Sequence, residues 1–194
     1  MNTTWSKQPN SQRGFTLIEL IIAIFILSIG IVGIFGAYSA MVVATSDISN
    51  RFTATYLAQE GIEIVKNIRD TNWTNIAKYC SGQTTCNYTW VDGLSSCANG
   101  CEADYTTNGT TSVMKTWPAG GYLLTDAISG FYNYSGGIQT KFKRKITINI
   151  SGDEMKVSVT VYWNKKASLI SPGGLAAEPN SGSVTAEEDL YNWK

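Results

Sequence analysis

The sequence predicts an α+β protein in which one long N-terminal helix packs on a small antiparallel sheet. An uncharged apolar run from Leu20 to Ala37 is followed by apolar residues at spacings of three and four. This spacing indicates a helix that continues beyond the run. Near the C-terminus, two stretches alternate apolar and polar residues on either side of a short turn. That alternation is typical of a β-hairpin with one buried face.

The apolar run is long enough to cross most of a membrane. Eighteen helical residues span about 27 Å, and the hydrocarbon layer of a bilayer is roughly 30 Å thick. Lys7 and Arg13 precede the run. Positive residues on that side predict a single-pass protein whose N-terminus stays in the cytoplasm and whose C-terminal domain is exported. We expect residues 15–44 to be the membrane half of the helix, after a polar leader at residues 1–14.

Glu19 lies at the start of the apolar stretch, where a charged side chain costs a few kcal/mol. A cut between Gly14 and Phe15 would create an α-amino group, whose usual pKa is about 7.7 to 8.0, at the same depth. This amine, on the same chain or on a neighbouring one, is the candidate partner of Glu19. Alternatively, Thr16 and Glu19 form a capping box that binds free amides at the helix start.

Two other kinds of segment share the apolar pattern. A secretory signal peptide would have Lys7 and Arg13 as its positive region and a small-residue cleavage site at Ala37-Tyr38-Ser39. A signal anchor would keep the run uncleaved and hold a surface adhesin or binding domain. Both alternatives leave Glu19 without a role.

Residues 14–20, Gly-Phe-Thr-Leu-Ile-Glu-Leu, resemble the class III signal of type IV pilins and type II secretion pseudopilins. In that family a prepilin peptidase cuts after the glycine and methylates the new N-terminal residue, which correspond to Gly14 and Phe15. The resemblance implies that Glu19 neutralises the terminal amine on Phe15 of an adjacent subunit during filament assembly. It also implies a pilin-like fold.

One departure from the family pattern lies in the membrane helix. Major pilins often carry a proline at the place where this chain has Gly36. Gly30, Gly33 and Gly36 can loosen the helix instead, because each glycine costs up to about 1 kcal/mol relative to alanine. Residues 57–69 resemble, more weakly, minor pilins of the pilus modification or V-type.

Composition argues against catalysis. The chain has no histidine, which is the commonest general base and metal ligand. No nucleophile and base pair and no Gly-rich phosphate loop can be proposed, so we predict a protein that is not an enzyme and needs no cofactor or metal. Loss of a leader with two basic residues would leave thirteen basic against fifteen acidic residues. That balance does not suggest nucleic acid as a partner.

Residues 45–70 are expected to form the amphipathic half of the helix. Polar residues such as Asn50 and Glu63 lie outside its apolar stripe. The stripe should pack on the domain of the same chain. We expect the helix to end at Asp70-Thr71-Asn72. The stripe consists of Ala54, Leu57, Ala58, Gly61, Ile64, Val65 and Ile68.

A polar region at residues 71–115 contains all four cysteines. Four cysteines allow three connectivities. Local pairing is our first expectation, because an exported domain meets an oxidising space. A four-cysteine zinc site is the alternative, although no Cys-x-x-Cys spacing is present. The cysteines are Cys80, Cys86, Cys97 and Cys101.

Residues 116–194 are expected to form an antiparallel sheet head. Its main hairpin turns at Ser151-Gly152-Asp153-Glu154, and its apolar face should lie on the helix stripe. Weaker strands are expected beside the hairpin at residues 121–125 and 131–134. A flexible loop at residues 172–182 and a last strand or short helix at 184–193 complete the prediction.

Three lysines, Lys141, Lys143 and Lys145, share the hairpin face opposite the core, with Tyr162 opposite Lys143. Such a row can follow a phosphate backbone. It can equally be a solvated face that discourages aggregation between strands. DNA binding by a competence pilin is the functional hypothesis. Oligonucleotide binding that is absent, or unchanged in Lys143→Gln, would remove it.

These patterns predict a structural subunit of a type IV pilus-like filament, specifically a minor pilin. Its partners would be other pilin subunits, the prepilin peptidase and the inner-membrane assembly platform, with membrane lipid around the helix before assembly. It would lie first in the inner membrane and then in a cell-surface filament. The alternatives are a secretion pseudopilin, a DNA-binding competence pilin and a signal-anchored adhesin.

Overall fold

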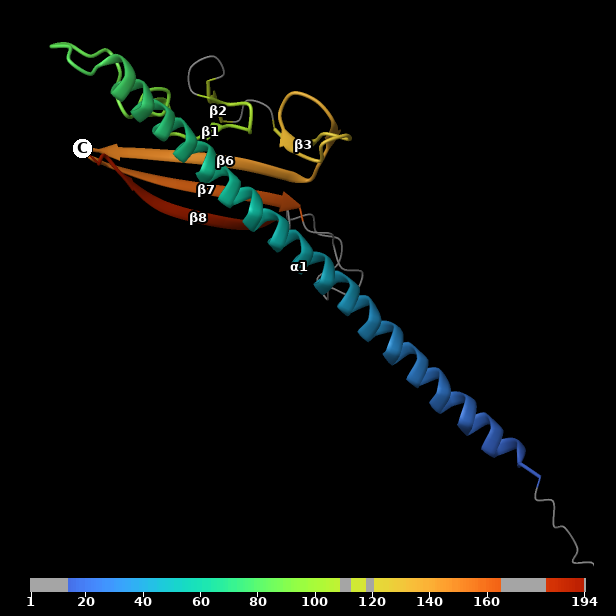
Figure 1. Cartoon of the computed structure of the whole chain (residues 1–194). Coiled ribbons are helices and arrows are strands. Elements are labelled where there is room, and N and C mark those ends of the chain that lie inside the picture. Colours follow the sequence, from blue (N-terminus) through green and yellow to red (C-terminus); the bar gives the residue numbers. More distant parts are fainter. Residues whose placement is uncertain (1–13, 109–112, 118–120, 165–180, 194) are drawn as a thin grey trace, which may run out of the picture. The chain divides into compact units, whose positions relative to one another are not determined.

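A computed structural model describes residues 14–108, 113–117, 121–164 and 181–193. The expected leader, apart from Gly14, and most of the expected loop at 172–182 lie outside this part. The chain divides into two units, residues 1–42 and 43–194. Helix α1, Leu17–Tyr79, belongs to both units (Figure 1).

The start of α1 has one half of the expected capping box. Thr16 precedes the helix, and its Oγ1 accepts a hydrogen bond from the Glu19 backbone N–H at 3.4 Å. The Thr16 carbonyl oxygen accepts the first helical hydrogen bond, from Leu20 N at 3.2 Å. By length and composition, α1 is able to cross a membrane.

The end of α1 lies beyond the predicted stop at Asp70-Thr71-Asn72, so that prediction is wrong. The helix is 63 residues long and continues to Tyr79. The Asn72 side chain is buried and donates hydrogen bonds to the carbonyl oxygens of Trp90, at 3.3 Å, and Asp92, at 2.9 Å. Trp73 then packs against the core. These tertiary contacts outweigh the weak helix propensity of the Asp-Thr-Asn sequence.

The main sheet has the strand order β2-β1-β6-β7-β8 in the described part of the chain, and every pair is antiparallel. The predicted hairpin is confirmed: only Gly152 and Asp153 separate its two strands, and Tyr162 pairs with Lys143. The strand bounds are β1 Cys101–Glu102, β2 Lys115–Thr116, β6 Phe142–Ser151, β7 Glu154–Asn164 and β8 Ser181–Tyr191.

The weaker predicted strands form, but they do not extend the hairpin. They pair with each other and with a third strand in a second sheet of order β4-β3-β5. β1 pairs with β6 at Cys101 and Ile146, while Leu123 N, just before β3, donates a hydrogen bond to the Phe142 carbonyl oxygen at 2.8 Å. The bounds are β3 Leu124–Thr125, β4 Tyr132–Asn133 and β5 Ile138–Gln139. A short 3-10 helix, η1, spans Ser95–Cys97.

The last predicted element is a strand rather than a helix. β8 pairs with β7 along its whole length. Its Val184 and Ala186 pack against the core, and Leu190 is buried in it. Core-facing residues at even spacings are the pattern of a β-strand, in which alternate side chains point to the same face, and Ser181–Tyr191 is accordingly extended.

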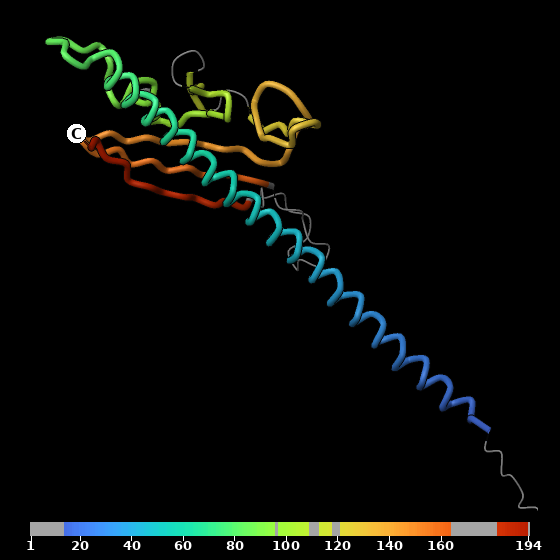
Figure 2. The backbone as a smooth tube through the Cα atoms, viewed as in Figure 1, coloured from blue at the N-terminus to red at the C-terminus, as the bar shows by residue number. Residues whose placement is uncertain are grey.

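The core of the 43–194 unit lies between α1 and the main sheet (Figure 2). All seven residues of the predicted helix stripe are buried. Asn50, which was expected on the polar face, is buried as well. Gly61 lets α1 approach the sheet closely, because a Cβ at this position would stand 2.8 Å from Val159 Cγ1 and 3.1 Å from Arg144 Cδ.

Candidate processing and assembly site

The predicted cleavage point is exposed at the start of the described chain. Phe15 is 84% exposed. Among the atoms of the described residues, a Cβ on Gly14 would meet none within 4 Å. The described part of the fold therefore does not require glycine at position 14, whereas a peptidase that selects for a small residue would.

Glu19 lies in the first turn of α1, and its side chain is exposed. Its backbone N–H is bound by the Thr16 hydroxyl, and a carboxylate near a helix N-terminus is favoured by the helix dipole. Among the described residues, no basic side chain pairs with Glu19. Its carboxylate is therefore free to bind a cation from outside this part of the chain.

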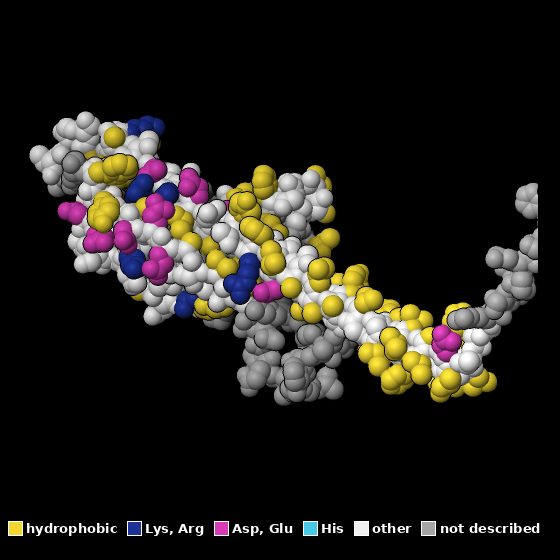
Figure 3. All heavy atoms as spheres, turned by 90° about the horizontal axis from the view of Figure 1, so that it is seen from below, with side chains coloured by type: hydrophobic (Ala, Val, Ile, Leu, Met, Phe, Trp, Pro, Cys, Tyr) yellow, Lys and Arg dark blue, Asp and Glu magenta, His cyan; other side chains and the backbone are white. Residues whose placement is uncertain are grey.

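The first part of α1 presents an uncovered apolar surface. None of the side chains at residues 14–42 is buried. Large residues such as Phe25, Ile34 and Phe35 are each about two thirds exposed or more. Hydrophobic side chains gather along this part of the helix in Figure 3. A continuous apolar surface of this extent marks contact with lipid or with other protein chains.

The cysteines pair locally in the structure, Cys80 with Cys86 and Cys97 with Cys101. The first pair follows the end of α1 and lies near the surface. The second is buried beside the Sδ atom of Met114, which is 3.3 Å from Cys97 Sγ. Within the described residues, no group of three or more His, Cys, Asp or Glu side chains could hold a metal ion.

We expect the two disulfides to differ in their access to reductant. Mild dithiothreitol should open Cys80–Cys86 first, because the attacking thiolate must reach a sulfur atom. Alkylation followed by intact mass should then show two labelled cysteines in the folded protein and four after unfolding. Equal labelling of all four cysteines under native conditions would contradict this, and four free thiols in freshly isolated protein would contradict the pairing itself.

Each of the three lysines, Lys143 and Lys145 in β6 and Lys141 just before it, contacts a different residue. Lys143 Nζ lies 4.4 Å from the centroid of the Tyr122 ring. The aliphatic part of Lys145 covers Gly100, where a Cβ would clash with it. Lys141 is exposed, with its Nζ 5.7 Å from the ring of the next residue. Nucleic-acid contact by this row stays a prediction.

Arg144 is the charged residue that the sequence pattern missed. It lies on the apolar face of β6, between Phe142 and Ile146, and is fully buried. Its Nη1 donates to the Leu57 carbonyl oxygen at 3.0 Å and pairs with Glu60 Oε2 at 3.1 Å. An arginine at an inward position of a hairpin is the sequence signal that could have identified it.

Arg144 also reaches the segment that follows β1. Its Nη2 donates to the carbonyl oxygen of Ala103 at 2.6 Å, and the Tyr134 hydroxyl donates to the Arg144 carbonyl oxygen at 3.3 Å. Asp104 Oδ2 accepts from Tyr134 N at 2.9 Å, and its Oδ1 accepts from the Thr106 hydroxyl at 2.6 Å. We call Arg144, Glu60, Asp104 and Tyr134 the buried polar centre. It ties α1 and β6 to the segments that follow β1 and β4.

The surroundings in the buried polar centre shift the pKa values of Asp104 and Tyr134. Burial alone would raise the pKa of the Asp104 carboxyl, but hydrogen bonds from Thr106 and Tyr134 and the charge of Arg144 outweigh burial, so the pKa is lowered from 3.8. Burial raises the pKa of the Tyr134 hydroxyl above its usual 10.0. Both shifts favour the protonation states that prevail at neutral pH.

Comparison with known proteins gives a match in the N-terminal part of the chain. The family model described as the prokaryotic N-terminal methylation motif matches residues 9–35. This match contains Gly14, Phe15 and Glu19 together with the first part of α1. No curated protein and no solved structure matches the chain. The chain therefore carries the N-terminal methylation motif, and its long apolar helix with antiparallel sheets has a pilin-like layout.

Proposed function

We propose that this chain is a structural subunit, a minor pilin, of a type IV pilus-like filament. One observation carries the proposal: the methylation motif covers the start of α1, and none of the apolar side chains from residue 14 to residue 42 is buried. A protein that remained a monomer in water could not keep such a surface. Lipid covers it before assembly, and the helices of other subunits cover it in the filament.

In this proposal, a prepilin peptidase cuts after Gly14 and methylates the new amine on Phe15. The protein waits in the inner membrane as a single-pass subunit, with its 43–194 unit exported. The assembly platform then moves it into a filament. Glu19 of one subunit binds the terminal amine of a neighbour, which sets the register of the helices.

N-terminal mass analysis of the protein from its host tests this sequence of events. We expect a chain that starts at methylated Phe15. Gly14→Val should block cleavage, because its branched side chain would not fit a peptidase site shaped for glycine. Gly30→Val is the matched control, since Gly30 also has no neighbouring atom within 4 Å. A chain that starts at Ala40, as signal peptidase would leave it, contradicts the proposal.

Shearing separates the alternatives to a pilus subunit. A pilus subunit should appear with filaments released from the cell surface, whereas a secretion pseudopilin should stay with the cell envelope. A signal-anchored adhesin should keep its leader and remain in the membrane fraction. The quantity to measure is the fraction of processed protein in each compartment at equal total protein.

A further inference from the structure

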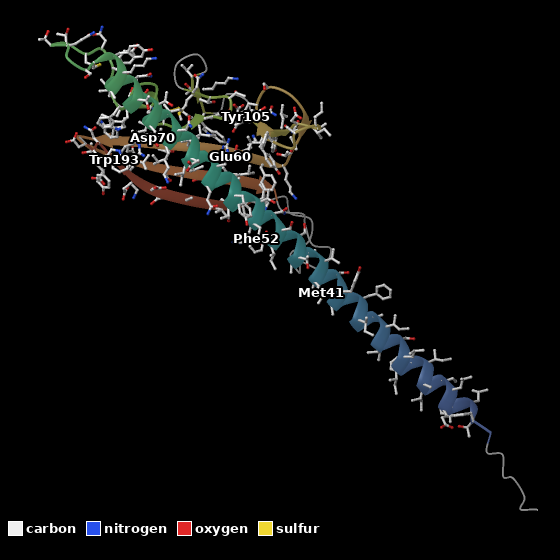
Figure 4. All side chains as sticks on the ribbon, in the orientation of Figure 1. Met41, Phe52, Glu60, Asp70, Tyr105 and Trp193 are labelled. Atoms are coloured by element: carbon white, nitrogen blue, oxygen red, sulfur yellow. A yellow bond between two sulfur atoms is a disulfide. The ribbon has the colours of Figure 1, made fainter. Side chains whose placement is uncertain are left out.

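Strand β8 forms one edge of the main sheet, and its outer side is open. It pairs with β7 along its whole length of 11 residues, and the strand order ends with it. Among the described residues, no backbone hydrogen bond reaches its outer side. Figure 1 shows β8 on the outside of the sheet, and Trp193, which follows β8, is labelled in Figure 4. An open edge is a row of unpaired N–H and C=O groups with which another chain can pair.

The register shows which backbone groups of β8 face outward. Residues along an antiparallel strand direct their N–H and C=O groups alternately to the two sides. Asn192, just after β8, donates its N–H to the Asp153 carbonyl oxygen at 2.8 Å, on the β7 side. Even-numbered residues of β8 therefore form hydrogen bonds with β7, whereas odd-numbered residues direct their backbone groups outward. We call the outward backbone groups of four residues the open edge: Ser183, Thr185, Glu187 and Asp189.

The open edge lacks features that normally protect an edge strand from pairing. Such strands are often very short, or carry lysine, proline or a bulge. The opposite edge of the sheet is protected in this way, because β2 has only 2 residues, one of which is Lys115. β8 has neither lysine nor proline, and its register with β7 is unbroken. This edge is therefore suited to accept a further strand.

Charge selects the strand that the open edge can accept. Glu187 and Asp189 share one cation, Lys156, which pairs with Glu187 at 3.2 Å and lies opposite Asp189. The hydrogen bond and charge of Glu187, with the charges of Asp189 and Glu154, raise the pKa of Lys156. Among the described residues, Asp189 and Glu154 form no ion pair. This part of the sheet face therefore keeps a net negative charge.

We propose that the open edge binds an extended segment of another protein that carries basic side chains at alternate positions. The segment adds a strand beside β8, with main-chain hydrogen bonds to residues 183–189. Side chains two residues apart lie on one face of a strand, so the bases lie together on the face that carries Glu187 and Asp189. This inference goes beyond the proposed function and does not depend on filament assembly.

A second copy of β8 fits the open edge less well. A parallel pair in register, or an antiparallel pair centred on Glu187, would place like charges directly opposite each other, which destabilises a sheet. Other registers leave the acidic residues of each copy without an added cation. The acidic residues thus oppose pairing of the protein with itself, but they attract a basic strand.

Binding of a synthetic peptide to the full chain in detergent tests the inference. The probe is a short fluorescent peptide in which lysine and valine alternate. One control peptide has glutamate in place of lysine, and the other carries N-methyl groups on its lysine amides. Both controls should bind at least about tenfold more weakly, because they lose charge attraction or main-chain hydrogen bonds. Equal binding of either control, or no binding of the lysine peptide, overturns the inference.

Three variants locate the site on the chain. Asp189→Lys should weaken binding of the lysine peptide by about tenfold or more, because it reverses a charge at the open edge. Glu63→Lys makes the same charge change at an exposed position of α1 and should leave binding unchanged. Thr185→Pro removes an outward N–H, which an edge strand tolerates, and should abolish binding. Equal binding by the Asp189 and Glu63 variants contradicts the proposed site, even if the proline variant does not fold.

Amide exchange at single residues, followed by NMR, shows which side of β8 is bound. We expect the amides of Thr185 and Glu187 to become protected only when the lysine peptide is added. Protection of these amides without peptide would show pairing with a second copy and would overturn the inference. Exchange that is unchanged at saturating peptide also overturns it. These measurements are independent of cleavage after Gly14 and of filament assembly, so the proposed function is tested separately.

Discussion

Glu19→Ala is expected to leave the protein processed, folded and inserted in the membrane while lowering its fraction in filaments by tenfold or more. Among the described residues, Glu19 has no basic partner within its own chain. The proposed partner is the amine that cleavage after Gly14 would create on Phe15. Loss of the carboxylate removes that pairing, and about 1.4 kcal/mol already corresponds to a factor of ten in an equilibrium.

The variant should accumulate as an inner-membrane monomer. Removing a charge from a membrane helix lowers the cost of insertion by a few kcal/mol, so the membrane-bound state becomes more stable. The measurement compares the sheared fraction with the membrane fraction at equal total protein. Wild-type amounts of Glu19→Ala in sheared filaments would refute an assembly role.

Two further variants separate the charge from the helix cap. Glu19→Gln keeps a side chain suited to a capping box but removes the charge, and it should fail as the alanine variant does. Thr16→Ala removes the hydroxyl that binds Glu19 N at 3.4 Å but keeps the charge. It should assemble, because loss of a cap weakens the start of the helix equally in the membrane and in the filament. The reverse result would make Glu19 a structural cap.

Arg144→Ala should destabilise the 43–194 unit by about 3 kcal/mol, because a fully buried side chain is lost together with two hydrogen bonds from a charged donor, each worth about 1.5 to 3 kcal/mol. The variant would leave the carbonyl oxygens of Leu57 and Ala103 without their donors, and Glu60 without its cation. Denaturant unfolding of the full chain in detergent measures the loss. An unchanged midpoint would show that the buried polar centre does not contribute to stability.

Lys156→Ala is the matched control for Arg144→Ala. Lys156 also forms an ion pair from the main sheet, with Glu187 at 3.2 Å, but both side chains are about half exposed. Exposed pairs are screened by water and salt and contribute little. We therefore expect almost no change in the unfolding midpoint of this variant.

The same centre predicts loss of stability at both ends of the pH scale. The pKa of Asp104 is lower in the folded state, so its contribution is present above the usual 3.8 and is lost as the pH falls through the folded value. The pKa of Tyr134 is raised in the folded state, so its contribution is lost as the pH rises above 10.0. Tyr134→Phe should remove this part of the alkaline loss in unfolding curves.

Local patterns in the sequence determined the N-terminal motif, the apolar helix and the hairpin with its register. Each of these rests on residues close together in the chain, where the spacing of side chains decides which face is apolar. The turn at Gly152 and Asp153 fixes which residues face each other, so the pairing of Lys143 with Tyr162 followed from counting alone.

Only the tertiary structure decided the end of α1, the second sheet and the role of Arg144. The helix continues past Asp70 because Asn72 binds carbonyl groups 18 and 20 residues away. Arg144 is tolerated in the core because Leu57 and Ala103, 87 and 41 residues distant, supply its acceptors. A buried charge needs such partners, and residues so far apart in the chain meet only once it has folded.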